Sequence, residues 1–360
     1  MKERKHYLDN IRWITVILVI IYHIFYVFNC SGIAGPFNIS GVKALDSFCV
    51  FVYPWFMCLL FVVAGISMKY SLEKRTNKEF VKDRAKRLLV PSIVGSILFT
   101  WIVGYVGAKY GSGFGDTYIP GPIKFMIYVL SGSGPLWFAR ALFIISLVLL
   151  LIRKIDKKDK LSKLGKKVEP WMLIPMFLIV WGSSFVFNMP LITVYRMGIY
   201  TTMTLLGYYI FSNEELIKKM EKLVIPLIIT TIIVGTIYTY RHFGLMYADN
   251  ALLSTFATNA YLWLAVISII VFAKKYLNFT NRFFDYMNKN NFGFYAYHLM
   301  FIVIFGYVYL EYINYTYFWP IYVFMTVGTV ICLPVFVFVL SKIPVLNTLC
   351  LGMKKKEKSE

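Results

Sequence analysis

Apolar residues gather in ten runs along the chain, separated by short polar and basic segments. An α-helix needs roughly 20 predominantly apolar residues to cross a bilayer, so each run is a candidate span, although the fourth and fifth are short. The pattern predicts an all-α integral membrane protein, built as a bundle of about ten transmembrane helices. The runs cover residues 11–29, 48–68, 88–107, 136–152, 171–187, 192–211, 223–240, 251–273, 291–310 and 318–340.

Lys and Arg residues are concentrated on one side of these runs. With the N-terminus in the cytoplasm, 32 of the 38 fall in cytoplasmic segments, and the other six are Lys43, Lys109, Lys124, Arg140, Arg196 and Arg241. Short cytoplasmic loops carry such an excess of basic residues, which predicts that both termini are cytoplasmic. Residues 1–345 are expected to form the transmembrane domain, and residues 346–360 a basic cytoplasmic tail.

The composition excludes a soluble globular protein. Hydrophobic residues make up 59% of the chain and charged residues 16%, and the mean hydropathy is +0.65, so a membrane is needed to cover the apolar surface. The net charge of +20 reflects the basic loops rather than a surface for nucleic acid. The first run is too long for the core of a signal peptide, and no small-residue cleavage site follows it.

The positions of cysteines and carboxylates narrow the function further. The five cysteines are scattered, with no CxxC motif or Cys/His cluster, so neither a disulfide framework nor a metal site is expected. No internal repeat is visible, and no carboxylate falls at the centre of a predicted span. Both observations disfavour an ion-coupled carrier, which usually needs a carboxylate at the membrane midplane.

The stretch from Asp9 to Asn29, DNIRWITVILVIIYHIFYVFN, contains the first run and carries a polar stripe. Arg12 and His23 are 11 positions apart, which on an α-helix places them on one face, about 16 Å apart along the axis. Asp9 lies one turn before Arg12, and Tyr26 one turn after His23. Ionisable groups in a membrane normally face a cavity or a partner, so the stripe is a functional-site hypothesis. His23 can serve as a general base, and the alternative is a histidine bonded to a neighbouring helix.

Basic and aromatic groups also open the third and ninth runs. Arg84 and Arg87 are three residues apart in KDRAKR and project from neighbouring positions on a helix. One interpretation is a phosphate site, because guanidinium groups bind phosphate oxygens through two parallel hydrogen bonds. The other, which is the commoner role of such a basic cluster, is to fix the orientation of the helix in the membrane. The segment NFGFYAYH places His298 about two turns into the ninth run, either as a site residue or as a packing histidine.

The link before the fourth run holds two further features. PLWFAR enters that run from outside, with Trp137 typical of a membrane interface and Arg140 able to reach outward. The amphipathic segment IKFMIYVL at 123–130 is predicted to lie on the membrane surface. A buried Arg140 would complete an outer polar cluster facing an acceptor, with Arg196, Arg241 and Glu311.

Four of these motifs, in their order along the chain, resemble the membrane acyltransferase 3 family. They are YLDNIR with the R-x10-H spacing, RAKR with LLVP, LWFARALFI and FGFYAYHL. The resemblance covers nearly the whole chain. The sequence departs from the family at 63–68, where VAGISM stands in place of the more usual Ser-Gly-Phe, so that Ser67 or the turn at Gly65 is expected to take over that part.

The resemblance implies a stand-alone O-acyltransferase of the cell membrane, in a bacterium, without an appended hydrolase-like domain. Such enzymes move an acyl group, often acetyl or succinyl, from cytoplasmic acyl-CoA to a hydroxyl of an envelope or exported carbohydrate, and no permanently bound cofactor is expected. His23 is implied as the catalytic residue, with Arg12, Arg84 and Arg87 contacting the CoA donor. The residues expected in support are Asp9, Tyr26, His298, Trp137, Arg140 and Glu311.

Two functions of other classes remain open on the sequence. A carrier or flippase for a lipid-linked or anionic sugar would use the arginines and aromatic residues to hold a head group. A scaffold subunit of an envelope polymer synthase would make no use of the polar stripe.

Overall fold

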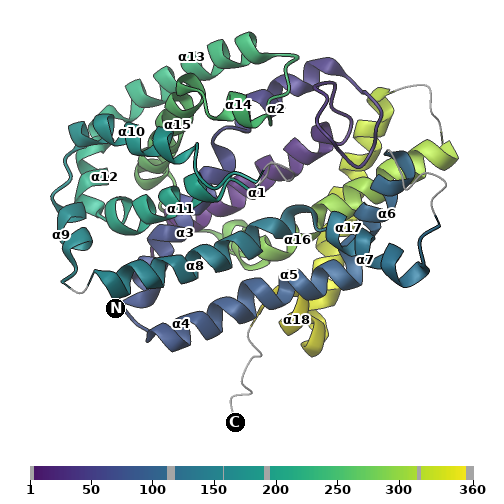
Figure 1. Ribbon diagram of the computed structural model, residues 1–360, viewed down its shortest axis with the longest axis horizontal. Helices are drawn as coiled ribbons and strands as arrows, with labels where there is room; N and C mark the ends of the chain where they lie inside the picture. Colours follow the sequence, from purple (N-terminus) through teal and green to yellow (C-terminus); the bar gives the residue numbers. More distant parts are fainter. Residues whose placement is uncertain (1–3, 112–117, 157, 190–194, 314–317, 354–360) are drawn as a thin grey trace. The chain divides into compact units, whose positions relative to one another are not determined.

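The computed structural model describes residues 4–111, 118–156, 158–189, 195–313 and 318–353. These residues form helices and, apart from one isolated bridge between Asn188 and Arg196, no β-structure. The α-helices, labelled in Figure 1, are α1 (His6–Tyr26), α2 (Asp46–Val52), α3 (Phe56–Leu72), α4 (Asn77–Arg84), α5 (Val90–Gly95), α6 (Trp101–Tyr110), α7 (Gly121–Ser131), α8 (Trp137–Ile155), α9 (Lys160–Lys166), α10 (Leu173–Ser183), α11 (Met197–Leu206), α12 (Glu214–Met220), α13 (Val224–His242), α14 (Asn250–Leu253), α15 (Phe256–Tyr276), α16 (Arg282–Val308), α17 (Phe318–Lys342) and α18 (Pro344–Leu351).

The chain divides into two compact units. Unit 1 comprises residues 1–18, 47–81 and 144–288, and unit 2 comprises residues 19–46, 82–143 and 289–360. Helices α1, α2, α4, α8 and α16 contribute residues to both units.

Eight helical segments in the described part of the chain are long and apolar enough to cross a membrane. They correspond to the first four and last four predicted runs, which confirms an all-α integral membrane bundle. The fifth and sixth runs form shorter helices, α10 and α11, of 11 and 10 residues. The fourth run, expected to be short, belongs to a 22-residue helical segment because the helix begins at Gly134 and continues into the basic link as far as Ile155.

Glycines on α3 and its partner set the core of unit 1. A Cβ added at Gly65 would lie 2.1 Å from the carbonyl oxygen of Thr204, and one added at Gly207 would lie 2.2 Å from that of Val62. Small residues let two helix backbones approach in this way inside a membrane. Gly65 therefore serves as a packing residue between α3 and α11.

The third span runs from Asn77 to Tyr110 and contains two π-helical segments, Ala85–Leu89 and Ser96–Thr100. Such π segments are rare and are frequent at functional sites. Arg87 lies in the first segment, and Ser96 begins the second.

Helix α7, which contains the segment predicted to lie on the membrane surface, packs along α6. A Cβ added at Gly104 would lie 2.2 Å from the carbonyl oxygen of Tyr128, and one at Gly132 would lie 2.4 Å from that of Thr100. The chain then reaches the middle of α16, where the hydroxyl of Tyr295 donates to the carbonyl of Pro135 at 2.7 Å. The sequence pattern did not predict this contact, because it depends on glycines in two helices that are far apart in the chain. No residue of α7 is buried, and its position on the membrane surface stays a prediction.

The C-terminal helix α18 packs against α5 and α17 (Figure 1). It ends at Gly352, whose left-handed backbone (φ +62°) lies against the backbone of Arg87. The expected boundary between bundle and tail at residue 345 falls inside this helix, and residues 354–360 lie outside the described part of the chain.

Candidate active site

Helix α1 carries the predicted polar stripe on one uninterrupted helix from His6 to Tyr26. In unit 1, Arg12 donates from Nη1 to Oδ1 of Asp9 at 2.7 Å and from Nη2 to Oγ of Ser67. The Ser67 hydroxyl donates in turn to the carbonyl of Val63, one turn earlier on α3, at 2.8 Å. The serine oxygen therefore orients the arginine. In VAGISM, the segment at 63–68 that departs from the family pattern, the residue bonded to Arg12 is Ser67 and not Gly65.

The carboxylate of Asp9 holds two arginines. Its Oδ2 accepts from Nε and Nη2 of Arg4 at 3.0 and 2.9 Å, while its Oδ1 accepts from Arg12. Two guanidinium groups and one carboxylate leave this cluster with one net positive charge, and the Arg12 side chain stays 32% exposed. Such a group can meet an anion at the start of α1.

In unit 2 the structure brings together the two membrane histidines. Nε2 of His298 lies 3.2 Å from Nδ1 of His23, and the two rings are 4.9 Å apart between centroids. His298 is completely buried, whereas His23 is partly exposed. His298 also lies farther along its helix than expected, because α16 begins at Arg282, nine residues before the apolar run.

The hydrogen-bond partners assign the protons on this pair. Nδ1 of His298 lies 3.1 and 2.8 Å from the carbonyl oxygens of Phe294 and Tyr295, so it carries the proton and its Nε2 accepts. Nδ1 of His23 lies 2.8 Å from the carbonyl of Val19 and faces Nε2 of His298, so it also carries its proton. The lone pair of His23 is then on Nε2, which has no partner among the described residues.

Aromatic rings surround the histidine pair. The ring of Tyr26 lies 5.8 Å from that of His23, but its hydroxyl donates to the carbonyl of Ala34 in the following loop. Tyr295 lies 6.1 Å from His298 on one side and 5.6 Å from Phe138 on the other. These rings give the pair an apolar wall and leave proton chemistry to the imidazoles.

Arg140 is the basic group of unit 2 placed near this level. Its Nη2 donates to Oγ of Ser96 at 3.4 Å, and its Nε is buried without a partner in the described part of the chain. The ring of Phe99, three residues after Ser96, lies 5.6 Å from that of Tyr297, the residue before His298. An arginine inside a bilayer bundle without a carboxylate partner is expensive, which is typical of a group that meets an anion or a developing negative charge.

The expected outer cluster of arginines with Glu311 is wrong for Arg140. Glu311 forms an ion pair with Lys109 at 2.9 Å and accepts from the hydroxyl of Tyr110. Tyr110 lies 14 residues beyond Ser96 on the same helical span, or about 21 Å at 1.5 Å per residue. Arg140 and Glu311 therefore lie at different levels of unit 2, because Arg140 contacts Ser96 and Glu311 contacts Tyr110.

The other two members of the expected cluster belong to unit 1 and differ in exposure. In unit 1, Arg196 is buried and its Nη2 donates to the carbonyl of Leu253 at 2.9 Å, whereas Arg241 is exposed. Trp137, expected at a membrane interface, is buried in unit 2 with its ring 6.2 Å from that of Phe138.

Of the arginines of the KDRAKR segment, Arg84 immediately precedes the first π-helical segment and Arg87 lies within it. Arg87 is exposed and donates from Nε to Oδ1 of Asp83 at 3.0 Å, one turn before it, while Arg84 is partly buried. Arg87 lies eight residues before Gly95, where an added Cβ would come within 2.9 Å of the Tyr297 hydroxyl. A rise of about 12 Å along the helix thus separates the arginine segment from the level of the histidines.

Two polar residues that support α1 escaped the sequence reasoning. Asn10 is completely buried, and its Nδ2 donates to the carbonyls of Leu277 and Phe279 at 2.7 and 2.8 Å. The indole of Trp13 donates to Oδ1 of Asn10 at 3.0 Å. An asparagine inside a hydrophobic run is the signal that marks such a group, because a buried amide needs partners.

The comparisons with known proteins agree with the motifs. The family model for the acyltransferase domain of the acyltransferase 3 family matches residues 5–337. A search of curated proteins and a search of solved structures returned no significant match. Since the match includes the helices that carry the histidine pair and the arginine segment, this multi-pass membrane chain belongs to the membrane acyltransferase 3 family and is an acyltransferase.

Proposed function

We propose that the protein transfers an acyl group, acetyl or succinyl, from cytoplasmic acyl-CoA to a hydroxyl of an envelope or exported carbohydrate. The observation that carries this proposal is the histidine pair of unit 2, in which the hydrogen bonds leave the lone pair of His23 on Nε2. A neutral imidazole with a fixed tautomer and an unoccupied lone pair is the form required of a general base.

The donor is proposed to bind through its phosphates to the basic residues at the ends of the helices. In unit 2 the candidate donor contacts are Arg84 and Arg87, and in unit 1 a separate candidate is Arg12, which Ser67 orients. Guanidinium groups suit phosphate oxygens because they donate two parallel hydrogen bonds. The pantetheine arm then extends along unit 2 over the rise of about 12 Å that separates Arg87 from the level of the histidines.

In the direct route the acceptor hydroxyl attacks the thioester carbonyl carbon. Nε2 of His23 takes the hydroxyl proton, the new C–O ester bond forms and the C–S bond breaks. The CoA thiolate leaves and takes that proton from the His23 imidazolium, which returns to its neutral form. His298 accepts from Nδ1–H of His23 throughout and stabilises the imidazolium that forms. Arg140 supplies positive charge at this level for the oxyanion of the tetrahedral intermediate.

In the alternative route Nε2 of His23 attacks the thioester itself. The C–S bond breaks, CoA leaves, and an acyl-imidazole carries the group until an acceptor hydroxyl displaces it. Both routes need the same lone pair. They differ in that the second releases CoA before any acceptor binds.

The experiment is single-turnover release of CoA from labelled acetyl-CoA by purified protein in lipid nanodiscs. The His23→Ala variant is expected to lose roughly 10²–10⁴-fold of the transfer rate, the usual contribution of a general base. Ile232→Ala, on an exposed face of α13, is the matched control and should keep the native rate. Near-native transfer by a folded His23→Ala protein would overturn the assignment, and movement of a labelled lipid-linked sugar independent of His23 would support a carrier.

A further inference from the structure

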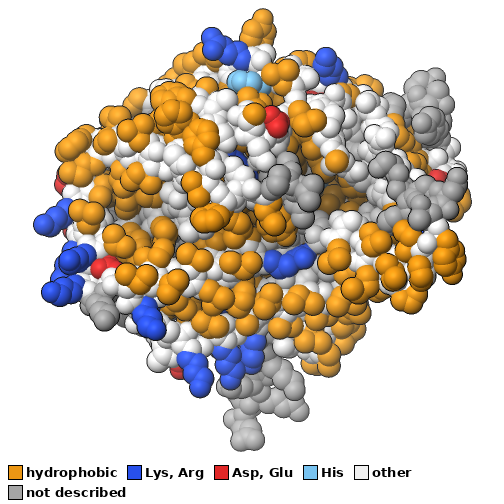
Figure 2. Space-filling model, in the orientation of Figure 1, with side chains coloured by type: hydrophobic (Ala, Val, Ile, Leu, Met, Phe, Trp, Pro, Cys, Tyr) orange, Lys and Arg blue, Asp and Glu red, His pale blue; other side chains and the backbone are white. Residues whose placement is uncertain are grey.

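The arginine segment lies where the third span changes from charged to apolar. The sequence KDRAKR is followed by LLVPSIVGSI, in which Ile93 and Ile97 are 47% and 46% exposed. Figure 2 shows basic side chains along α4 and hydrophobic side chains along α5. Phosphate groups remain at such a boundary, because charge is expensive among hydrocarbon tails. In the proposed function the nucleotide of the donor therefore stops at the level of Arg87, and only the pantetheine arm extends to the histidines.

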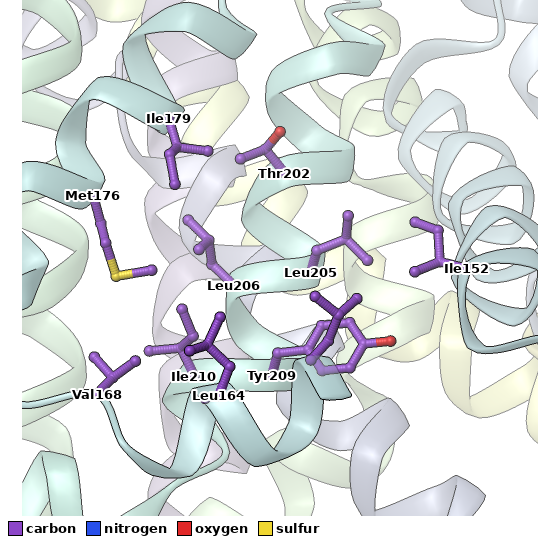
Figure 3. Close-up of a pocket in the computed structure, with 12 residues that line it drawn as sticks. Ile152, Leu164, Val168, Met176, Ile179, Thr202, Leu205, Leu206, Tyr209 and Ile210 are labelled. Carbon is purple, nitrogen blue, oxygen red and sulfur yellow. The ribbon is translucent and has the colours of Figure 1, made fainter. Parts of the chain in front are cut away.

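A cavity of about 280 Å³ in unit 1 gives these phosphates no alternative site. It lies between α8, α9, α10 and α11, and Figure 3 shows Met176 and Ile179 facing Leu206 across it. None of the described residues that line it carries a charge. A phosphate placed against such a wall would lose its hydration without gaining a partner. The position of the donor then depends on what holds the arginines, and in unit 2 this can be followed from contact to contact.

The end of α18 is fixed by one tyrosine of α16. The hydroxyl of Tyr297 donates to the carbonyl of Cys350 at 3.0 Å, and both residues are completely buried. The last four carbonyls of a helix have no partner within that helix, so this bond satisfies a group that burial would otherwise leave unpaired. The bond therefore orders the last turn of α18 against α16.

A second contact, one turn earlier on α16, holds the same end. A Cβ added at Gly293 would lie 3.0 Å from Cδ2 of Leu351, so the leucine side chain packs directly onto the glycine. Gly293 and Tyr297 are four residues apart and therefore share one face of α16. The last two residues of α18 are thus packed against the helix that carries His298.

The residue that follows this end lies against the arginine segment. Gly352 has a left-handed backbone (φ +62°), and its N–H donates to the carbonyl of Asn347. Glycine adopts this conformation at helix ends without the steric cost that a side chain adds. A Cβ added at Gly352 would lie 2.9 Å from both Cα and the carbonyl oxygen of Arg87. The two backbones are therefore in direct contact, and the end of α18 connects Arg87 with Tyr297.

We propose that Tyr297 is a positioning residue for the acyl-CoA donor, and that it acts on Arg87 through the end of α18. This role rests on the proposed function, in which Arg87 binds the donor and the histidine pair receives its thioester. The bond from Tyr297 to Cys350 holds Gly352 in place, and Gly352 holds the backbone of Arg87 at a fixed distance from the helix of His298. That distance has to match the pantetheine arm, because the phosphates and the thioester are two parts of one ligand.

The first variant is Tyr297→Phe, measured in nanodiscs with acyl-CoA and with acyl-pantetheine, which lacks the nucleotide. It removes the hydroxyl but keeps the ring, which lies 5.6 Å from that of Phe99 and 5.3 Å from that of Phe336. The KM for acyl-CoA is expected to rise about threefold to tenfold, the effect of one neutral hydrogen bond, with kcat near native and the KM for acyl-pantetheine unchanged. The matched control is Tyr322→Phe, which removes the hydroxyl of another buried tyrosine of unit 2, bonded to the N–H of Val42, and should keep the native KM.

A double variant shows whether Tyr297 acts through Arg87. Tyr297→Phe combined with Arg87→Ala should have the same KM as Arg87→Ala alone, because the side chain being positioned is already absent, whereas independent effects would multiply. Gly352→Ala disturbs the contact with Arg87 from the side of α18, and it should raise the KM for acyl-CoA with the same loss of additivity. Gly121→Ala is its control, because nothing lies within 4 Å of the added Cβ.

Hydrogen exchange of residues 85–90 reports the same coupling without a substrate. It should be several-fold faster in Tyr297→Phe and Gly352→Ala than in Tyr322→Phe. Native exchange in the first two variants, multiplied effects in the double variant, or a fall in kcat at native KM in Tyr297→Phe would overturn the role of Tyr297. A raised KM in Arg87→Ala beside a native KM in Tyr297→Phe would overturn this role alone. An unchanged KM in Arg87→Ala would overturn the donor assignment of the proposed function, and the role of Tyr297 with it.

Discussion

Nε2 of His298 lies 3.2 Å from Nδ1 of His23, and the Nδ1 of His298 is held by two carbonyls of its own helix. The two imidazoles are therefore arranged in series, with the buried one orienting the partly exposed one. In the function proposed above, this relationship makes His298 a positioning residue for His23, and its loss should affect turnover more than donor binding.

The first prediction concerns that positioning. His298→Leu removes the acceptor that faces Nδ1 of His23, and kcat is expected to fall roughly five- to hundredfold, with the KM for acyl-CoA little changed, because the imidazolium that forms on His23 keeps only the carbonyl of Val19 as an acceptor for Nδ1–H. His298→Gln retains an acceptor oxygen and should recover part of the rate. Steady-state kinetics of both variants provide the measurement, and equal rates for Leu and Gln would show that His298 only fills space.

The second prediction concerns the arginine segment. Arg84→Ala and Arg87→Ala should each raise the KM for acyl-CoA about tenfold to hundredfold, because a hydrogen bond to a charged group contributes about 1.5–3 kcal/mol. Acyl-pantetheine lacks the nucleotide phosphates and serves as the control substrate. With it the variants should match the native enzyme, and a KM for acyl-CoA that does not change would identify both residues as topology anchors.

The third prediction concerns Ser67. Its oxygen accepts from Arg12 while its proton goes to the carbonyl of Val63. Ser67→Ala should raise the KM for acyl-CoA roughly fivefold, the effect of about 1 kcal/mol, and leave kcat near native. Ser67→Thr keeps the hydroxyl and is the matched control. A lowered kcat at unchanged KM in Ser67→Ala would place the serine in another role.

The fourth prediction concerns helix packing. Gly65→Ala would place a methyl group 2.1 Å from the carbonyl of Thr204, and α3 and α11 would have to separate, which should lower the free energy of unfolding by about 3 kcal/mol or more. Gly182→Ala is the matched control, because nothing lies within 4 Å of its added Cβ. There the change should be neutral or stabilising by about 0.5–1 kcal/mol. Unfolding in mixed SDS micelles measures both, and similar stabilities would contradict the prediction.

The fifth prediction concerns Cys30 in the loop after α1. Burial raises the pKa of its thiol, and the nearby carboxylate of Asp46 raises it further. Less thiolate is then present at pH 8 than for a free cysteine, so alkylation is expected to be slow. Asp46→Asn should lower the pKa of Cys30 and speed alkylation several-fold at pH 8, with the two rates converging as the pH rises above both pKa values. Rates are read from mass spectrometry of the Cys30 peptide, and a slower reaction in Asp46→Asn would contradict the sign.

The sequence was sufficient for the spans and for the first-helix histidine. Runs of about 20 apolar residues, separated by basic loops, determine which segments can cross the membrane. Helix geometry alone is enough to predict that Arg12 and His23, 11 residues apart, lie on one face of the first helix. His23 and His298 are 275 residues apart, so their contact depends on how the spans pack. No periodicity within either run contains that information.

The structural features that the sequence did not predict depend on contacts between segments that are distant in the chain. Arg140 donates to Ser96, one of two serines within the third apolar run. Helix α7 lies along α6 because Gly104 and Gly132 have no side chains and allow the two backbones to approach closely. A pattern of apolar and polar positions records which face of a helix is hydrocarbon-like. It does not record which neighbour covers that face, and the histidine pair and the Arg140 contact both depend on the neighbour.

The position of Gly352 has a practical consequence. Gly352 lies directly against the backbone of Arg87, so a purification tag or a topology reporter fused to the C-terminus, eight residues later, is tethered close to the segment proposed to receive the nucleotide of the donor. Bulky fusions there should compete for space with CoA. Activity measured on tagged preparations would then understate that of the native chain, and proteolytic removal of the tag should restore it.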